Sequence, residues 1–203
     1  MTWDYANQYP PGHFHLICAS VPCTEYSRAK TIGQRNLRAA DDLVAVTLQI
    51  IDYFQRNMWW IEKPSTSLLK LRERLNVFPY VELVYCQFSE WGYQKPTRFW
   101  GSQQFRNLEN RQCDRQTCPN LVTQPNGIKR HKFNLGGHDM KFSTKMKGRI
   151  PHYLLDYFLS SEPQFQNLLP RHVKFNLPTT QKKSQKITVV EHVSQEKIVK
   201  DEN

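Results

Sequence analysis

The stretch that most constrains this chain is an apolar run that ends in a cysteine. Residues 13–27 read HFHLICASVPCTEYS, so the apolar residues from Phe14 to Ala19 give way to Pro22 and Cys23. A short apolar run bounded by turn residues is typical of a buried strand followed by a loop. Open α/β sheets keep their reactive groups at the carboxyl ends of strands. The pattern predicts a buried strand that presents Cys23, a candidate nucleophile, on the following loop.

A second apolar run has the same layout. Residues 58–61 (MWWI) lead directly into Glu62, Lys63 and Pro64, which places a carboxylate at the end of a second predicted strand. Burial of that carboxylate costs free energy unless it is paired or hydrogen-bonded, and a ligand could supply the partner. The alternative is a surface salt bridge between Glu62 and Lys63.

Helices and further strands are expected around these two runs. Asn36 can cap a helix with apolar residues at three- and four-residue steps, which should pack on the sheet. Those residues are Leu37, Ala40, Leu43, Val44, Leu48, Ile51 and Phe54. We also expect a short helix over 68–75, a strand over 81–86 in which Cys86 is a small core residue, an aromatic strand headed by Arg98, and a helix over 150–159.

Three blocks in this order resemble motifs of the DNA (cytosine-5) methyltransferases. Residues 22–27 (PCTEYS) resemble the family's proline-cysteine loop, and residues 61–64 (IEKP) resemble its Glu-Asn-Pro block. Residues 91–100 (WGYQKPTRFW) resemble its Gln-x-Arg-x-Arg block and match at Gln94 and Arg98.

This resemblance implies roles for individual residues. In the family the cysteine attacks carbon 6 of a flipped-out cytosine and the glutamate holds the base, which implies these roles for Cys23 and Glu62. Arg98 is implied to bind the cytosine carbonyl or a phosphate. A partly buried arginine stacked on Trp91 or Trp100 is the alternative for that side chain.

The resemblance also implies a fold and a cofactor. It spans residues 3–159 and implies an α/β fold, a partial Rossmann-like methyltransferase sheet with flanking helices. The methyl donor would be S-adenosylmethionine, with Pro22 as a contact residue. Because no strand and Gly-rich turn precede Cys23, we expect the N-terminal cofactor-binding half to be absent. One sheet edge would then be exposed, to be covered by the C-terminal tail or by association.

Departures from the family pattern keep other functions open. Lys63 stands where the family has asparagine and Pro96 where it has an arginine. One alternative is therefore a truncated, inactive nucleic-acid-binding relative, from a mobile element or working with a second polypeptide that supplies the missing half. Another is an unrelated thiol enzyme that uses Cys23 with His13 or His15.

Positive charge predicts DNA as the partner. The chain carries a formal charge of +10 with a pI near 9.5, and such chains favour polyanions. Candidate phosphate-contacting residues lie in the loop after Cys23, which is mobile in the family, in the third block and in a basic stretch further on. They are Arg28, Lys30, Arg35, Gln94, Lys129, Arg130, Lys132, Lys145 and Lys147. An ordinary exposed loop is the alternative for the first three.

A metal site and two segments complete the predicted organisation. Cys113, Cys118, His131 and His138 are spaced almost as in a Cys2His2 zinc site, with unligated surface residues as the alternative. We expect a catalytic domain over 1–162 containing a small basic insertion over 101–149, which is too short for an elaborate reader of base edges. A flexible tail would follow over 163–203, with a transient strand over 187–193.

Cysteine usage and hydropathy predict the cellular context. Five cysteines, an odd number without a paired framework, suit a reducing compartment, so we expect an intracellular protein, nuclear if eukaryotic. No stretch approaches the roughly 20 apolar residues of a membrane span, so no membrane partner is expected.

Overall fold

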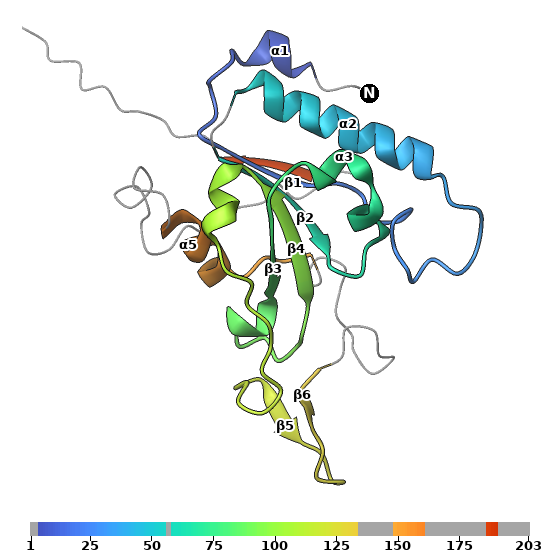
Figure 1. Cartoon of the computed structure of the whole chain (residues 1–203), viewed down its shortest axis with the longest axis vertical. Helices are drawn as coiled ribbons and strands as arrows, with labels where there is room; N and C mark the ends of the chain where they lie inside the picture. The colour runs from blue at the N-terminus through green and yellow to red at the C-terminus, as the bar shows by residue number, and fades with distance from the viewer. Residues whose placement is uncertain (1–3, 56–57, 134–147, 161–185, 191–203) are drawn as a thin grey trace, which may run out of the picture.

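The protein is an α/β structure built on a mixed sheet with helices on both faces. A computed structural model describes residues 4–55, 58–133, 148–160 and 186–190. Within these residues, five strands form a sheet in the order β3-β4-β2-β1-β7 (Figure 1). The predicted α/β class with flanking helices is confirmed, but only β1 and β2 pair in parallel and the other pairs are antiparallel.

The two apolar runs that lead to Cys23 and to Glu62 form the centre of the sheet. Strand β1 covers Leu16–Ser20 and β2 covers Trp59–Pro64, and they pair in parallel with Ala19 opposite Ile61. A strand buried on both faces reads as a continuous apolar run, which explains why both runs lack alternation. Their carboxyl ends therefore lie at the same end of the sheet.

Helix α2, Leu37–Tyr53, covers one face of these strands, as predicted. The side chain of Asn36 accepts a hydrogen bond from the backbone N–H of Ala39 at 3.0 Å, which caps the helix. The buried side of α2 packs on Ile17 and Ile61 from the sheet. The short helix α1, Tyr5–Gln8, lies against the C-terminal end of α2, where Tyr5 packs on Tyr53 (Figure 1).

Helix α5, His152–Ser160, covers the opposite face of the sheet (Figure 1). Its Leu154 and Phe158 are buried together with Trp60 and Phe99 of the sheet. Successive side chains of a strand point to opposite faces, so Trp59 and Trp60 belong to different cores. No helix in the described part of the chain is both long and apolar enough to cross a membrane.

Two elements differ from the sequence prediction. The helix expected over 68–75 divides into a 3-10 helix η1, Leu68–Leu71, and a helix α3, Glu73–Asn76. The break is at Arg72, whose backbone is extended and whose guanidinium pairs with Asp41 of α2. The strand expected over 81–86 ends earlier, because β3 covers Tyr80–Val84 and a 3-10 turn η2, Tyr85–Gln87, follows it.

Strands β3 and β4 complete one side of the sheet, and a hairpin extends beyond it. Strand β4, Pro96–Gly101, pairs antiparallel with both β2 and β3, and the 3-10 helix η3, Gln103–Asn107, follows it. Strands β5, Leu121–Thr123, and β6, Lys129–His131, form a separate two-stranded hairpin. The hairpin projects from the end of the sheet where β3 ends and β4 begins (Figure 1).

The other edge of the sheet is covered by a segment assigned to the tail. Strand β7, Lys186–Val190, pairs antiparallel with β1 along its whole length. This is one of the two outcomes expected for that edge, and it makes part of the predicted tail a strand of the sheet. The proposed boundary at residue 162 lies outside the described residues.

We predict that β7 protects β1. Deleting residues 186–203 should raise the amide hydrogen exchange of a peptide spanning Leu16–Ser20 and promote aggregation, because an unpaired strand edge templates pairing between molecules. Deleting residues 191–203 alone retains β7 and is the matched control. Equal protection of β1 in both deletion variants would contradict the prediction.

Candidate functional site

Glu62 is a buried carboxylate held by three donors from different segments. Its side chain is 8% exposed and pairs with the ammonium of Lys95 at 3.2 Å. The hydroxyl of Ser20 donates to Oε2 at 3.2 Å, and the hydroxyl of Tyr85 donates to Oε1 at 3.4 Å. Burial, and then the negative charge of Glu62, raise the pKa of Tyr85, which keeps that hydroxyl protonated as a donor. The carboxylate is thus paired inside the protein rather than in a surface salt bridge with Lys63.

Lys63 is buried beside Glu62 but on the other face of the sheet. It is 2% exposed, and its ammonium donates to the backbone carbonyl of Val21. Burial lowers the pKa of Lys63, and the charges of Glu62 and Cys23 partly oppose that shift. In the resembling family an asparagine braces this turn, and here the longer lysine side chain binds the loop that leads to Cys23.

Cys23 is the exposed cysteine among the five, all of which lie within the described residues and are free thiols. Pro22 beside it is also exposed. The ammonium of Lys63 binds the backbone carbonyl of Val21, two residues before Cys23. By contrast, burial raises the pKa of Cys18 well above its usual value, which makes that thiol a poor nucleophile.

The loop after Cys23 is folded around Arg35. The guanidinium of Arg35 donates to the backbone carbonyls of Glu25, Ser27 and Lys30 at 2.7 to 2.9 Å. The ammonium of Lys30 binds the carboxylate of Glu25 at 2.7 Å, and this hydrogen bond is the main reason that the pKa of Glu25 is lowered. Two of the three cations predicted to contact phosphate are therefore engaged inside the loop, while Arg28 is exposed.

Arg98 is not brought to Glu62. The register pairs Arg98 with Lys63 and Phe99 with Glu62, so Arg98 and Glu62 face opposite sides of the sheet. The guanidinium of Arg98 pairs with Glu82 at 2.9 Å. It also stacks 4.0 Å from the ring centroid of Tyr80 and 5.6 Å from that of Trp100.

This arrangement of Arg98 matches the stacked, partly buried alternative, with Tyr80 as an additional neighbour. The cation at Glu62 is instead Lys95, which was not among the predicted site residues. The signal for Lys95 was its position between Gln94 and Pro96 in the third block, where it precedes the strand that runs beside Glu62.

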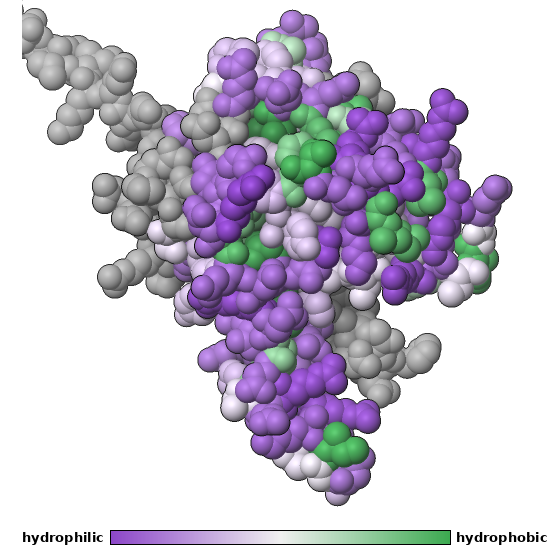
Figure 2. Space-filling model, in the orientation of Figure 1, coloured by the Kyte–Doolittle hydropathy of each residue, from purple (hydrophilic) through white to green (hydrophobic). Residues whose placement is uncertain are grey.

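The predicted DNA-contacting residues divide by location. Lys129, Arg130 and Lys132 are exposed on and just after β6, and Figure 2 shows mostly hydrophilic residues over the projecting hairpin. Gln94 is half-buried near the base of the hairpin, directly before Lys95. Lys145 and Lys147 lie outside the described residues.

Three of the predicted metal ligands converge, but with a different fourth partner. Cys113, Cys118 and His131 gather with Cys86, and the four ligand atoms all lie within 4.8 Å of one another. His138 lies outside the described residues. Cys86 is buried, as predicted, yet its place in this cluster was missed, because it lies 27 positions before Cys113 in the sequence.

The histidines considered for an unrelated thiol enzyme lie away from Cys23. His13 and His15 precede β1, whereas Cys23 follows it, so the strand separates them. The ring of His13 packs against Tyr9 with centroids 4.8 Å apart. This geometry places neither His13 nor His15 next to the thiol.

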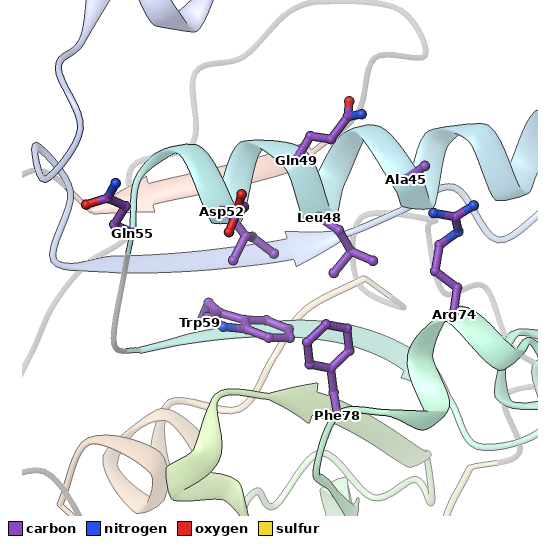
Figure 3. A pocket seen from close by; sticks show the side chains of 9 residues that line it. Ala45, Leu48, Gln49, Asp52, Gln55, Trp59, Arg74 and Phe78 are labelled. Atoms are coloured by element: carbon purple, nitrogen blue, oxygen red, sulfur yellow. The ribbon is translucent and has the colours of Figure 1, made fainter.

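The described residues do not form a site that fits S-adenosylmethionine. Ligands of open α/β sheets bind beyond the carboxyl ends of strands, where the strand order reverses. Here the antiparallel strand β7 occupies the position beside β1. A pocket of about 590 Å³ between α2 and the sheet is lined by Leu48, Asp52, Trp59 and Phe78 (Figure 3), at the amino end of β2 and away from Pro22.

Comparison with curated proteins gives a relative that bears the name of the resembling family. The chain is 28% identical to the probable DNA (cytosine-5)-methyltransferase of Frog virus 3 (isolate Goorha) over 168 residues, which cover 74% of this chain and 77% of the relative. No protein-family profile and no solved structure matches the chain. The chain therefore resembles the DNA (cytosine-5)-methyltransferases at the level of the family. This relative gives no support to a second polypeptide.

We predict that Arg35 maintains the Cys23 loop. Replacing it in Arg35→Met removes three charge-assisted hydrogen bonds to carbonyls, so trypsin should cleave after Arg28 several-fold faster than in the parent protein. Arg38→Met, at an exposed position in the first turn of α2, is the matched control and should leave the cleavage rate unchanged. An unaltered rate in Arg35→Met would show that the loop does not depend on this guanidinium.

Proposed function

We propose that this chain is a DNA (cytosine-5)-methyltransferase-like protein that binds a flipped-out cytosine at Glu62 and attacks it with Cys23. The observation that carries the proposal is that a buried carboxylate paired with Lys95 and an exposed thiol lie at or just beyond the carboxyl ends of the parallel strands β2 and β1, at one end of the sheet. Both occupy the positions that match the family's motifs, and the named relative supports a methyltransferase-like chain.

Glu62 has the capacity to hold the base. An ionised carboxylate offers about four acceptor directions, and three are directed at Ser20, Tyr85 and Lys95. A cytosine ring protonated at N3 is a cation, so it would replace or share the charge that Lys95 now supplies. Burial strengthens such a charge-assisted bond, which favours the protonated ring over the neutral one.

Cys23 would supply the nucleophile. Its thiolate forms a bond to carbon 6, the electrons of the carbon 5–carbon 6 double bond move toward carbon 5 and the N3 side of the ring, and the protonated N3 at Glu62 accommodates them. Carbon 5 then becomes nucleophilic. When carbon 5 takes a proton from solvent, a later loss of its original hydrogen to a base restores the double bond and expels the thiolate.

The basic hairpin would contact DNA next to this site. Val84 at the end of β3 pairs with Pro96 at the start of β4, and Pro64 at the end of β2 pairs with Thr97. The carboxyl ends of β1 and β2 and the base of the hairpin therefore lie at the same end of the sheet. Cations on the hairpin, with Arg28, would hold phosphates around an extruded base.

Transfer of a methyl group goes beyond the residues described. The resemblance implies S-adenosylmethionine, but the described residues do not provide a crevice for it. The alternative function is a nucleic-acid-binding relative that does not methylate, and the poor fit for the cofactor is the observation that favours it.

Attack by Cys23 can be tested without a methyl donor. DNA carrying tritium on carbon 5 of cytosine should release tritium to water when incubated with the purified chain, because addition at carbon 6 activates carbon 5. Cys23→Ser should abolish release, and Glu62→Gln should lower it by roughly 10²-fold or more through loss of ring protonation.

The control for Glu62→Gln is Glu82→Gln, which changes a partly buried carboxylate that pairs with Arg98 on the other face of the sheet. It should retain the parent rate. Tritium release that survives in Cys23→Ser would overturn the proposed nucleophile. No release by the parent protein, together with DNA binding, would favour the non-catalytic relative.

DNA affinity should depend on salt through the hairpin. A plot of log K against log salt concentration has a negative slope, and each phosphate contact adds about 0.9 to its magnitude. Combining Lys129→Ala with Arg130→Ala should therefore reduce the magnitude of the slope by about 2. The control is Arg74→Ala combined with Arg106→Ala, two exposed cations on α3 and η3 outside the hairpin. Equal slopes in the two double variants would contradict a phosphate-contacting hairpin.

A further inference from the structure

The base of the β5–β6 hairpin holds a cluster of three thiols and one imidazole. The ligand atoms of Cys86, Cys113, Cys118 and His131 all lie within 4.8 Å of one another. The Sγ atoms of Cys113 and Cys118 lie 3.4 and 3.6 Å from Nε2 of His131. Three sulfur atoms and one imidazole nitrogen, from three separate segments of the chain, thus lie together.

These distances match the edges of a tetrahedral zinc site. Zinc binds cysteine sulfur at about 2.3 Å and histidine nitrogen at about 2.0–2.1 Å, with angles near those of a tetrahedron. The sulfur and nitrogen atoms of such a site are then about 3.6 Å apart by simple trigonometry. The two distances to Nε2 of His131 fall at this value.

The hairpin also needs a stabilising element at this position. Its strands β5 and β6 have three residues each, and most of their side chains are exposed. An isolated two-stranded hairpin is marginally stable in water, and small units commonly depend on a metal or disulfide. Apart from Cys86 and Cys118 themselves, the buried hydrophobic residue in this cluster is Val84.

One polar anchor already connects the hairpin to the sheet end. The side-chain amide of Asn120 donates to the carbonyls of Cys86 and Ser89 and accepts from the backbone N–H of Gly92. This places Cys86, from the turn after β3, against the segment that carries Cys118. Cys86 and Cys118 are therefore brought together by hydrogen bonds of Asn120 that do not involve a metal.

We propose that Cys86, Cys113, Cys118 and His131 bind a structural zinc ion that fastens the basic hairpin to the end of β3. A closed set of three thiolates and one imidazole suits zinc, whereas hard cations such as magnesium prefer oxygen. With all four positions filled by protein, the ion has no open position for substrate and acts on folding. The site is separate from Glu62 and does not depend on the proposed activity.

The ion would set the position of Lys129 and Arg130. Both residues immediately precede the ligand His131 in β6, so fixing that imidazole fixes the strand that carries them. Zinc sites of this kind supply folding free energy to small units that lack their own core. Removal of the ion should therefore loosen the hairpin while leaving the five-stranded sheet folded.

Metal content gives the direct test. The purified full chain, expressed with zinc in the medium, should contain one zinc ion per molecule when its metal content is measured by inductively coupled plasma mass spectrometry. Protein refolded with cobalt should show the visible bands of tetrahedral cobalt. The intensity of its sulfur-to-cobalt charge-transfer absorption should correspond to three thiolate ligands. Cys23→Ser removes an exposed cysteine outside the cluster and should retain both signals.

The identity of the fourth ligand separates this proposal from the spacing-based set. In Cys86→Ser the charge-transfer absorption of the cobalt protein should fall from the intensity of three thiolates to that of two, and zinc should bind at least tenfold more weakly. His138→Asn should retain the parent spectrum and the parent affinity for zinc. Because Cys86 is buried, circular dichroism of Cys86→Ser checks that the sheet is intact, and His131→Asn provides a second, less buried ligand variant.

Three results would overturn the proposal. The first is that the parent protein contains no zinc after expression in the presence of zinc. The second is a disulfide between two of the cluster cysteines in reduced cell extracts. The third is loss of zinc in His138→Asn but not in Cys86→Ser. None of these outcomes bears on tritium exchange at Cys23, so failure of the zinc site and failure of the proposed function can be distinguished.

Discussion

The structure depends on satisfying two opposite charges that are buried side by side in the central strand. Glu62 and Lys63 are consecutive, so the pleat of β2 sends them to opposite faces, and neither can neutralise the other by direct contact. A buried ion is costly unless it is paired and hydrogen-bonded. The carboxylate of Glu62 accepts hydrogen bonds from β1, from the turn after β3 and from the residue before β4. The ammonium of Lys63 donates to a backbone carbonyl just before the Cys23 loop. The relative placement of these segments follows from that requirement.

The distribution of positive charge shows why composition does not identify a binding surface. The chain has an excess of cations, yet Arg35 organises a loop and Arg98 stacks over Tyr80 while pairing with Glu82. Those cations are engaged with the protein itself. By contrast, Lys129 on the hairpin is exposed at the end of the sheet that also carries the Cys23 loop. The location of a cation relative to internal acceptors decides whether its charge is available to a binding partner.

The two halves of the candidate site differ in how the fold supports them. Glu62 sits within a strand covered by α5 and by neighbouring strands, so its position is defined by the core. Cys23 and the hairpin are held by local devices instead, namely the guanidinium of Arg35 and the cluster around His131. Segments held by few contacts open at lower free energy than the core. This contrast predicts that the Cys23 loop and the hairpin open more readily than the strand that carries Glu62.

The sequence by itself determined the elements whose signal is local. The apolar runs before Cys23 and Glu62 predicted β1 and β2, and the periodic helix capped by Asn36 formed as expected, because burial and capping act over a few residues. Tertiary structure decided what depends on contacts between distant segments. Examples are the choice of Lys95 rather than Arg98 as the cation at Glu62, and the entry of Cys86 into the cluster of Cys113, Cys118 and His131. Strand register and chain reversal determine those contacts, and neither is written in the spacing of the residues along the chain.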